Sequence, residues 1–301
     1  MKTLTAFYDL EIGPVSYDFV VFLVKAELER KRIGADRLHV VIVPGAGPGG
    51  FRDKSKFYDE HEAKFRLWNI CIPACALIGA SVTLAADWAQ AGLLASRSGA
   101  GVWPVDWDRQ TLRTRPHLVG SLITAAKVGT PIPRLQASAH ARRVVRKLFA
   151  GRSVVTMTQR HTYLSARNTV PTEWRKAQEH ISGRGFAVLD INDVGVALAK
   201  GGGFAELSID LRMAVYQEAA LNLQANNGAA SLCWFSEKPY RMFDAGVGDT
   251  REEWRGLFED QGLPWGASWP WVTPHQRIVY ERSTAEVIIR EFESWVTATR
   301  S

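Results

Sequence analysis

The chain has 301 residues, a net charge of +6 and a pI near 9.3, with 46% hydrophobic and 23% charged residues. These proportions exclude a disordered or fibrous chain, and the length favours two lobes because one hydrophobic core rarely keeps growing to this size. The basic balance does not by itself indicate nucleic-acid binding, which needs a patch of charge rather than a sum.

The first predicted elements form a βαβ unit. We expect a strand over residues 3–10, a helix over 17–31 and a nearly continuous apolar strand over 39–44. Apolar residues at helical spacing mark the helix, and Ser16 or Asp18 supplies an acceptor at its start. The apolar run is typical of a parallel strand that is covered on both faces.

A glycine-rich loop at 45–50 follows the second of these strands. Glycines let backbone amides approach a phosphate, so an anion cradle is one interpretation of this loop. The spacing does not match the dinucleotide fingerprint, and a plain surface loop remains the alternative. We then expect a charged helix over 53–67 and a buried segment over 68–84.

A basic helix closes the first predicted lobe. Its cations, Arg142, Arg143, Arg146 and Lys147, are interpreted as a solvated face because no aromatic stacking motif accompanies them. The break at 150/151 divides the chain into an N-terminal α/β lobe, 1–150, and a C-terminal α/β lobe, 151–301, which a helix over 283–296 closes.

The second predicted lobe repeats the βαβ pattern. A strand over 153–158, a helix from Pro171 to Gly185 and a strand over 186–190 follow one another. A further helix is expected over 211–223, ending at 226–228, and 229–235 is either a strand or a short helix. The fold class expected from both halves is α/β with two Rossmann-like lobes.

The strongest candidate site is the segment 159–169, between the end of a strand and the start of a helix, where open α/β sheets bind ligands. Arg160 and Arg167 are candidates for neutralising a pyrophosphate, because guanidinium groups match phosphate oxygens in pairs, and Asn168 lies beside them. The alternative is that both arginines form only surface salt bridges.

A second candidate group consists of Asn227, Gly228 and Ala229, whose backbone could approach a ligand. Their alternative role is simply to end the preceding helix. The third group is Asp9 and Glu11, again at a strand end, where a carboxylate could act as a base toward an acceptor hydroxyl. Helix capping explains part of that segment without any chemistry.

Other motifs give little support for metal or hydrolase chemistry. The histidines have no zinc-ligand spacing, and neither a nucleophile elbow nor a P-loop is present. Asp106 and Asp108 resemble the Asp-x-Asp of metal-dependent sugar transferases, in a match short enough to arise by chance. Three cysteines at 71, 75 and 233 suit buried thiols, and the start of the chain lacks a signal peptide, so we expect a cytoplasmic protein without a membrane span.

Two stretches, 155–174 and 227–229, resemble bacterial glycosyltransferases of GT-B architecture, mainly over residues 150–245. The resemblance implies two Rossmann-like lobes with a cleft between them, no metal, and no cofactor beyond a nucleotide-sugar co-substrate. By position it implies that Arg160, Arg167, Asn168, Asn227, Gly228 and Ala229 hold the donor and that Asp9 or Glu11 serves the acceptor. The sequence departs from the family's pattern by lacking a glutamate-rich nucleotide motif and by being short for two complete lobes.

The predicted function is therefore transfer of a sugar from a nucleotide donor to a hydroxyl of a glycan or small molecule, as in carbohydrate biosynthesis. The alternative is a non-catalytic binding or assembly protein on the same scaffold, which fold analogy alone cannot separate from an enzyme. No nucleic-acid partner is expected. Peripheral membrane contact, the oligomeric state, and the identities of donor and acceptor stay open.

Overall fold

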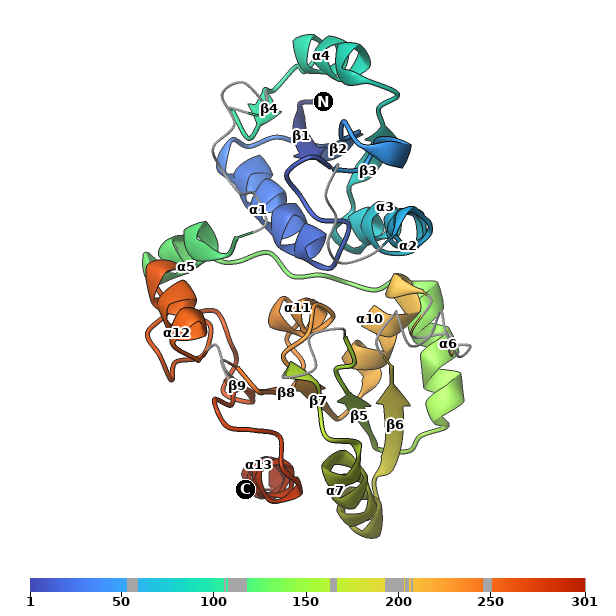
Figure 1. Cartoon of the computed structure of the whole chain (residues 1–301), viewed down its shortest axis with the longest axis vertical. Helices are drawn as coiled ribbons and strands as arrows, with labels where there is room; N and C mark the ends of the chain where they lie inside the picture. The colour runs from blue at the N-terminus through green and yellow to red at the C-terminus, as the bar shows by residue number, and fades with distance from the viewer. Residues whose placement is uncertain are drawn as a thin grey trace. The chain divides into compact units, whose positions relative to one another are not determined.

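The computed structural model shows an α/β chain with two parallel sheets (Figure 1). It describes residues 1–52, 59–105, 107, 118–162, 167–192, 203, 206, 208–245 and 251–300. Two compact units divide the chain: unit 1 comprises Met1–Leu122 and Pro131–Gln136, and unit 2 comprises Ile123–Thr130 and Ala137–Ser301. The predicted α/β class with two Rossmann-like lobes is confirmed.

The sheet of unit 1 has the order β3-β2-β1-β4, with parallel pairing throughout. Its strands are β1 (Thr3–Asp9), β2 (Arg37–Val43), β3 (Ser81–Leu84) and β4 (Val102–Trp103). The chain passes from β1 through β2 to β3 on one side and then places β4 on the other side of β1. The order of the strands therefore reverses between β1 and β4, the type of position at which open α/β sheets bind ligands.

Helices cover both faces of this sheet. They are α1 (Asp18–Arg32), α2 (Glu60–Arg66), α3 (Ile72–Ala74) and α4 (Trp88–Ser96), with a 3-10 turn at Pro48–Gly50, a π-helical turn at Leu67–Cys71 and a second 3-10 turn at Cys75–Ile78. The π-helical turn precedes Pro73, which has no N–H to donate to the carbonyl four residues earlier. The expected charged helix begins at Glu60, and residues 53–58 lie outside the described part of the chain.

Lys25 is buried in the middle of α1. Its Nζ donates to the Leu118 carbonyl at 3.3 Å and lies 6.0 Å from the centroid of the Trp103 ring. Burial lowers the pKa of Lys25 to about 8. The charged amine therefore costs the folded state free energy at neutral pH, because water solvates it better in the unfolded chain.

We expect Lys25→Met to raise the free energy of unfolding by about 1–3 kcal/mol at pH 7, as the apolar side chain keeps the length without the charge. Between pH 8 and the ordinary lysine value of about 10.4, the unfolded chain binds more protons than the folded one. The wild-type protein therefore gains stability as pH rises through that window, and the advantage of the variant shrinks. Urea unfolding at pH 7 and pH 10 measures both effects; a constant difference would contradict the assignment to Lys25.

The sheet of unit 2 has the order β6-β5-β7-β8-β9, again parallel. Its strands are β5 (Val154–Thr158), β6 (Ala187–Ile191), β7 (Leu221–Ala225), β8 (Tyr240–Phe243) and β9 (Gln276–Ile278). The chain goes from β5 outward to β6 and then returns past β5 to β7. The reversal therefore lies between β5 and β7.

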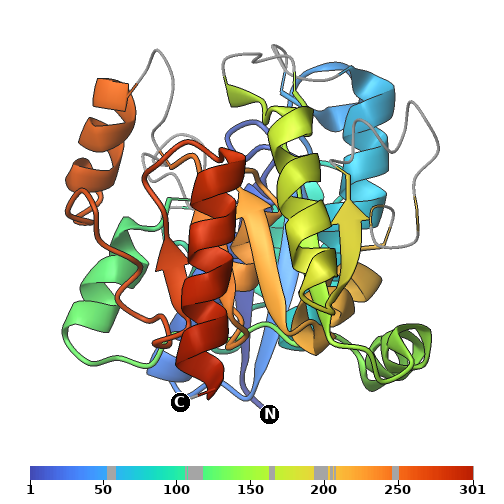
Figure 2. The same cartoon turned by 90° about the horizontal axis from the view of Figure 1, so that it is seen from below.

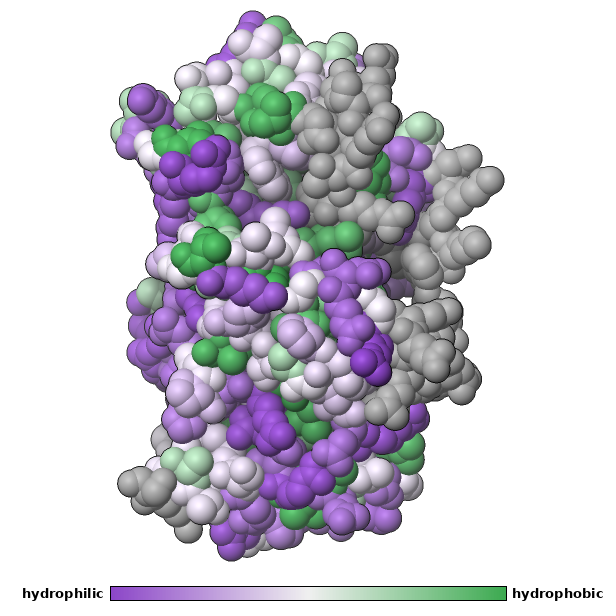
Figure 3. Space-filling model, turned by 90° about the vertical axis from the view of Figure 1, so that its left-hand side faces the viewer, coloured by the Kyte–Doolittle hydropathy of each residue, from purple (hydrophilic) through white to green (hydrophobic). Residues whose placement is uncertain are grey.

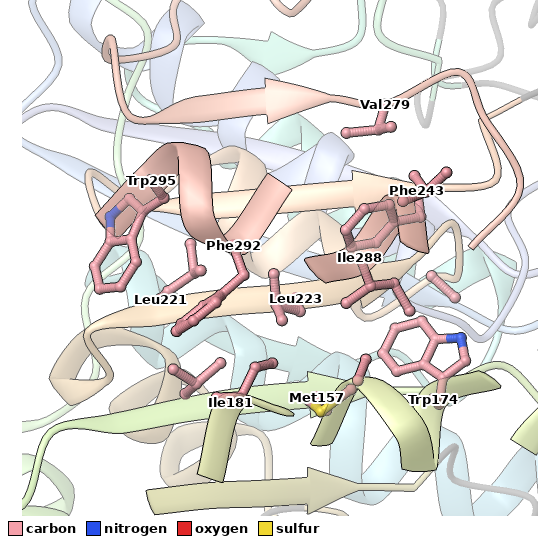
Figure 4. Packing of buried hydrophobic residues seen from close by; sticks show 14 of the residues in the cluster. Met157, Trp174, Ile181, Leu221, Leu223, Phe243, Val279, Ile288, Phe292 and Trp295 are labelled. Atoms are coloured by element: carbon pink, nitrogen blue, oxygen red, sulfur yellow. The ribbon is translucent and has the colours of Figure 1, made fainter. Parts of the chain in front are cut away.

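The helices of unit 2 are α6 (Ala139–Phe149), α7 (Pro171–Gly183), α10 (Ile209–Glu218), α11 (Ala230–Trp234), α12 (Arg251–Asp260) and α13 (Ala285–Arg300); α5 (Gly120–Lys127) starts in unit 1 and ends in unit 2. Figure 2 shows α7 and α13 beside one another on one face of the sheet. Buried residues such as Leu223, Ile288 and Phe292 fill the space between these helices and the sheet (Figure 4).

One expectation about unit 2 is wrong. The segment 211–223 is not one helix: α10 ends at Glu218, and a strand, β7, begins at Leu221. The asparagines at 226 and 227 therefore follow a strand, and of the two alternatives for 229–235 the structure has the short helix, α11. The basic helix α6 packs against α10 and lies in unit 2, whereas the boundary expected at 150/151 would place it in the first lobe.

The three cysteines are free and buried, as the sequence predicted. Burial raises the pKa of the Cys75 thiol to about 12, which leaves it protonated and unreactive at neutral pH. Among the described helices, none is long and apolar enough to cross a bilayer. On the face shown in Figure 3, hydrophobic residues form separate patches among hydrophilic ones, as is ordinary for a protein surface.

Candidate functional site

Two segments that the sequence analysis selected separately lie side by side at the carboxyl end of the unit 2 sheet. Arg160, two residues beyond β5, donates from Nη1 to the carbonyl of Asn226, the residue that follows β7. A second hydrogen bond joins the same two segments, because Asn227 Nδ2 donates to the Gln159 carbonyl at 3.3 Å. The structure thus brings Arg160 and Asn227 together at the reversal between β5 and β7.

Backbone contacts hold Arg160 in place. Its carbonyl accepts hydrogen bonds from the amide of Thr169 at 3.1 Å and from the Thr169 hydroxyl at 3.2 Å. Thr169 itself is buried. Thr169, at the far end of the segment, therefore fixes the backbone of Arg160, which favours a defined binding geometry for its guanidinium.

Asn168 stabilises the same loop through both ends of its side-chain amide. Its Oδ1 accepts from the amide of Thr162 at 2.7 Å, and its Nδ2 donates to the Thr162 carbonyl at 2.8 Å. Both ends of this amide are therefore engaged within the protein, and Asn168 shapes the loop that carries Arg167. Arg167 is described and half-buried, whereas residues 163–166 lie outside the described part of the chain.

The segment after β7 offers backbone rather than side-chain donors. The Asn227 Oδ1 accepts from the amide of Ala230, the first residue of α11, at 3.1 Å. Gly228 is exposed, and neither its amide nor that of Ala229 donates to a described residue. These two amides lie next to the Asn226 carbonyl that accepts from Arg160, so they extend the same edge of the sheet.

The edge also holds a half-buried carboxylate that the sequence analysis missed. Asp244 follows β8, and its two oxygens accept from the amide and hydroxyl of Ser283 at 2.8 and 2.7 Å. Burial raises the pKa of Asp244, against the opposing effects of Ser283 and of the nearby Arg282 and Arg160 guanidiniums. Asp244 thus lies close enough to Arg160 and Arg282 to interact with both electrostatically.

Arg282 is a third basic side chain at this edge. It is exposed, and its Nη2 donates to the Asn168 carbonyl at 3.4 Å. Asp244 comes directly after β8 and Arg282 four residues after β9, so the sequence signal for both was a charged residue beyond the end of a short strand. Those strands, β8 and β9, were not identified, because Arg241 and Arg277 interrupt their apolar patterns.

In unit 1, Asp9 ends β1 at the reversal between β1 and β4, and only 5% of it is exposed. Its Oδ1 accepts from the amide of Glu11 at 2.9 Å, and the Glu11 Oε2 accepts from the amide of Ala46 at 2.8 Å. The Asp9 carboxylate thus holds the backbone of Glu11, and the Glu11 carboxylate anchors the glycine-rich loop to the end of β1.

The glycine-rich loop makes most of its own hydrogen bonds. The Gly45 amide donates to Gly50 and the Gly47 amide to Phe51, each at 2.7 Å. A Cβ on Gly45 would lie 2.6 Å from the carbonyl carbon of Phe51, so a side chain there would collide with the backbone. These bonds leave few amides for an anion and favour the surface-loop interpretation of this segment.

The metal alternatives find no support in the described residues. Asp106 and Asp108 of the Asp-x-Asp match both lie outside the described part of the chain. Among the residues that are described, no group of three His, Cys, Asp or Glu side chains could hold a metal ion.

No protein-family model matches this chain, and no curated protein matches it in sequence. Solved structures are similar over its whole length. E. coli ADP-heptose LPS heptosyltransferase II has a TM-score of 0.51 at 12% identity, covering 100% of both chains. The family 9 glycosyl transferase from Veillonella parvula DSM 2008 has a TM-score of 0.53 at 10% identity, covering 99% of this chain and 98% of that one.

A third similar structure is the dodecameric iron-containing heptosyltransferase TibC in complex with ADP-D-β-D-heptose, with a TM-score of 0.51 at 12% identity over 99% of this chain and 77% of that one. At such low identity the similarity shows the fold alone. The predicted resemblance in fold to bacterial glycosyltransferases of GT-B type is confirmed.

Proposed function

We propose that this protein transfers a sugar from a nucleoside-diphosphate sugar to a hydroxyl group. The observation that carries the proposal is the meeting of Arg160 with the 226–229 segment at the reversal of a parallel sheet. Guanidinium groups and backbone amides are suitable donors to a diphosphate. The fold shared with glycosyltransferases supports the same chemistry by analogy.

In the proposed reaction, the acceptor oxygen attacks the anomeric carbon of the donor sugar, and the bond to the diphosphate breaks. The acceptor proton passes to a carboxylate of unit 1, Asp9 or Glu11, and the electron pair of the broken bond stays on the nucleoside diphosphate. Arg160 and Arg167 stabilise the negative charge that builds on this leaving group, which is the role that a metal ion plays elsewhere. We therefore propose a reaction that needs no metal.

A thermal-shift screen of nucleoside diphosphates and nucleotide sugars tests the proposal, because a ligand that binds only the folded state raises the melting temperature. ADP-linked sugars come first, since TibC was solved with ADP-D-β-D-heptose. A shift with one nucleotide, followed by sugar transfer, is expected. Silence across the panel would contradict the proposal and favour a non-catalytic scaffold.

Arg160→Ala should weaken binding of that nucleoside diphosphate by about 1.5–3 kcal/mol, the range for a hydrogen bond to a charged group. Arg160→Lys should recover only part of the loss, because an ammonium keeps the charge but lacks the paired donors. Isothermal titration measures both. Arg167→Ala should have an effect of the same kind.

Arg277→Ala serves as the matched control, because it removes an exposed arginine from β9 whose contact is an ion pair with Glu291 at 3.5 Å. Its affinity for the nucleotide should equal that of the wild type. Unchanged affinity in both Arg160→Ala and Arg167→Ala would exclude these arginines from the donor site.

A further inference from the structure

The basic helix α6 carries charge that the proposed reaction does not use. Its inner face, Ala141, Val145 and Phe149, is buried. Glu218 of α10 pairs with Arg142 at 2.6 Å and Arg146 at 2.8 Å. These contacts fix the orientation of α6 and determine which residues remain on its outer side.

Arg143 and Lys147 lie one helical turn apart on that outer side. Both are exposed, and neither forms an ion pair or hydrogen bond with any residue that the structure describes. Arg152, just beyond the helix, is exposed as well and donates to the carbonyls of Phe149 and Leu148, each at 3.1 Å. Together with Arg142 and Arg146, these residues form a cluster of five basic side chains. Within the described part of the chain, Glu218 is the one acidic residue that forms an ion pair with a member of this cluster.

An apolar ridge runs beside the cations. Leu148 is 48% exposed and lies one turn after the half-buried Val144, next to the Arg143–Lys147 pair. Helices that lie on membranes combine such an apolar edge with lysines and arginines. The Phe149 ring of α6 is buried, and the exposed ring of the helix is the small imidazole of His140 in its first turn, so the end that carries Leu148 favours a bilayer over a stacked nucleic-acid base.

We propose that the outer face of α6, defined by Arg143, Lys147, Leu148 and Arg152, docks on the surface of an anionic lipid bilayer. Arg142 and Arg146 flank this face and bring the cluster to five cations. Clusters of four or more basic residues on an amphipathic helix bind acidic headgroups, and each cation near the surface strengthens partitioning about fivefold. Leu148 enters the headgroup region beside them. The contact is peripheral and reversible, and it does not depend on the proposed sugar transfer.

The test is co-sedimentation of the full chain with vesicles of phosphatidylcholine that contain roughly one third phosphatidylglycerol. The wild type should bind these vesicles at low ionic strength, should not bind pure phosphatidylcholine, and should dissociate in about 1 M salt, where the Debye length falls to about 3 Å. The double variant Arg143→Ser/Lys147→Ser should bind about 30-fold more weakly, because it loses two cations.

Arg175→Ser/Lys238→Ser is the matched control, because it removes the same charge from exposed positions elsewhere in unit 2. It should bind as the wild type does, and both variants should keep the wild-type melting curve. Equal loss in both variants would show a general charge effect and overturn the proposal. So would wild-type binding in the Arg143→Ser/Lys147→Ser variant, or tighter binding to a DNA duplex than to the anionic vesicles at the same ionic strength.

Discussion

Asp9→Asn should lower kcat for sugar transfer by about 10²- to 10⁴-fold, the usual contribution of a general base. An amide cannot accept the acceptor's proton, but its oxygen can still accept the hydrogen bond that the Glu11 amide makes to Asp9 at 2.9 Å. The turn after β1 should therefore persist. Turnover with the donor from the thermal-shift screen measures kcat, and titration of that donor should give wild-type affinity.

Glu11→Gln is the comparison variant. The Glu11 carboxylate holds the glycine-rich loop through the Ala46 amide, and a carboxamide oxygen can accept the same bond. We expect at most a small change in kcat if Asp9 is the base. A variant pair in which Asp9→Asn keeps full activity and Glu11→Gln loses it would transfer the role to Glu11, and full activity in both would remove the carboxylates from the mechanism.

The βαβ units were predictable because each of their elements has one dominant signal. The strand β5 is an unbroken apolar and β-branched run, and α7 begins with Pro171 in its first turn. The division of 211–223 into α10 and β7 was not predictable from periodicity. Ile209 to Glu218 is buried over most of its length, so it shows almost no amphipathic pattern, and no glycine marks its end.

The strand β7 was not predictable for a second reason, which is the polar residues on its buried face. Asn222 and Gln224 point to a fully buried polar face, where Asn222 accepts from the Thr156 hydroxyl at 2.7 Å. A buried strand with alternating polar residues resembles an exposed one in sequence. The hydroxyl that donates to Asn222 lies 66 positions away on β5, and a local pattern cannot reveal it.

The candidate site was predictable where strand ends could be located. Arg160 follows a clear strand, and the rule for open sheets then places it at a ligand-binding edge. Its contact with Asn226 depends on β7 lying next to β5, which only the folded sheet establishes. Asp244 shows the limit most clearly, because its hydroxyl partner, Ser283, is 39 residues distant.

Trp174→Ala should lower the free energy of unfolding by about 3–5 kcal/mol, the usual cost of truncating a buried tryptophan. Trp174 is 1% exposed and packs edge-on against Phe243, with ring centroids 6.2 Å apart. Its Nε1 also donates to the Ser283 hydroxyl at 3.1 Å. The substitution therefore leaves a cavity between α7 and the sheet and removes a contact to the residue that holds Asp244.

Trp174→Phe separates these two effects, because it keeps most of the packing and deletes the donor. We expect it to cost about 1 kcal/mol, the net value of one hydrogen bond. Trp68→Ala is the control for removing an indole, since 61% of Trp68 is exposed and a surface substitution should change stability by less than about 0.5 kcal/mol. Urea unfolding of the three variants measures the series. Equal stabilities for Trp174→Ala and Trp68→Ala would contradict the packing of α7 described above. Trp174 lies on α7 and is enclosed by the sheet and α13, so its removal must leave a void.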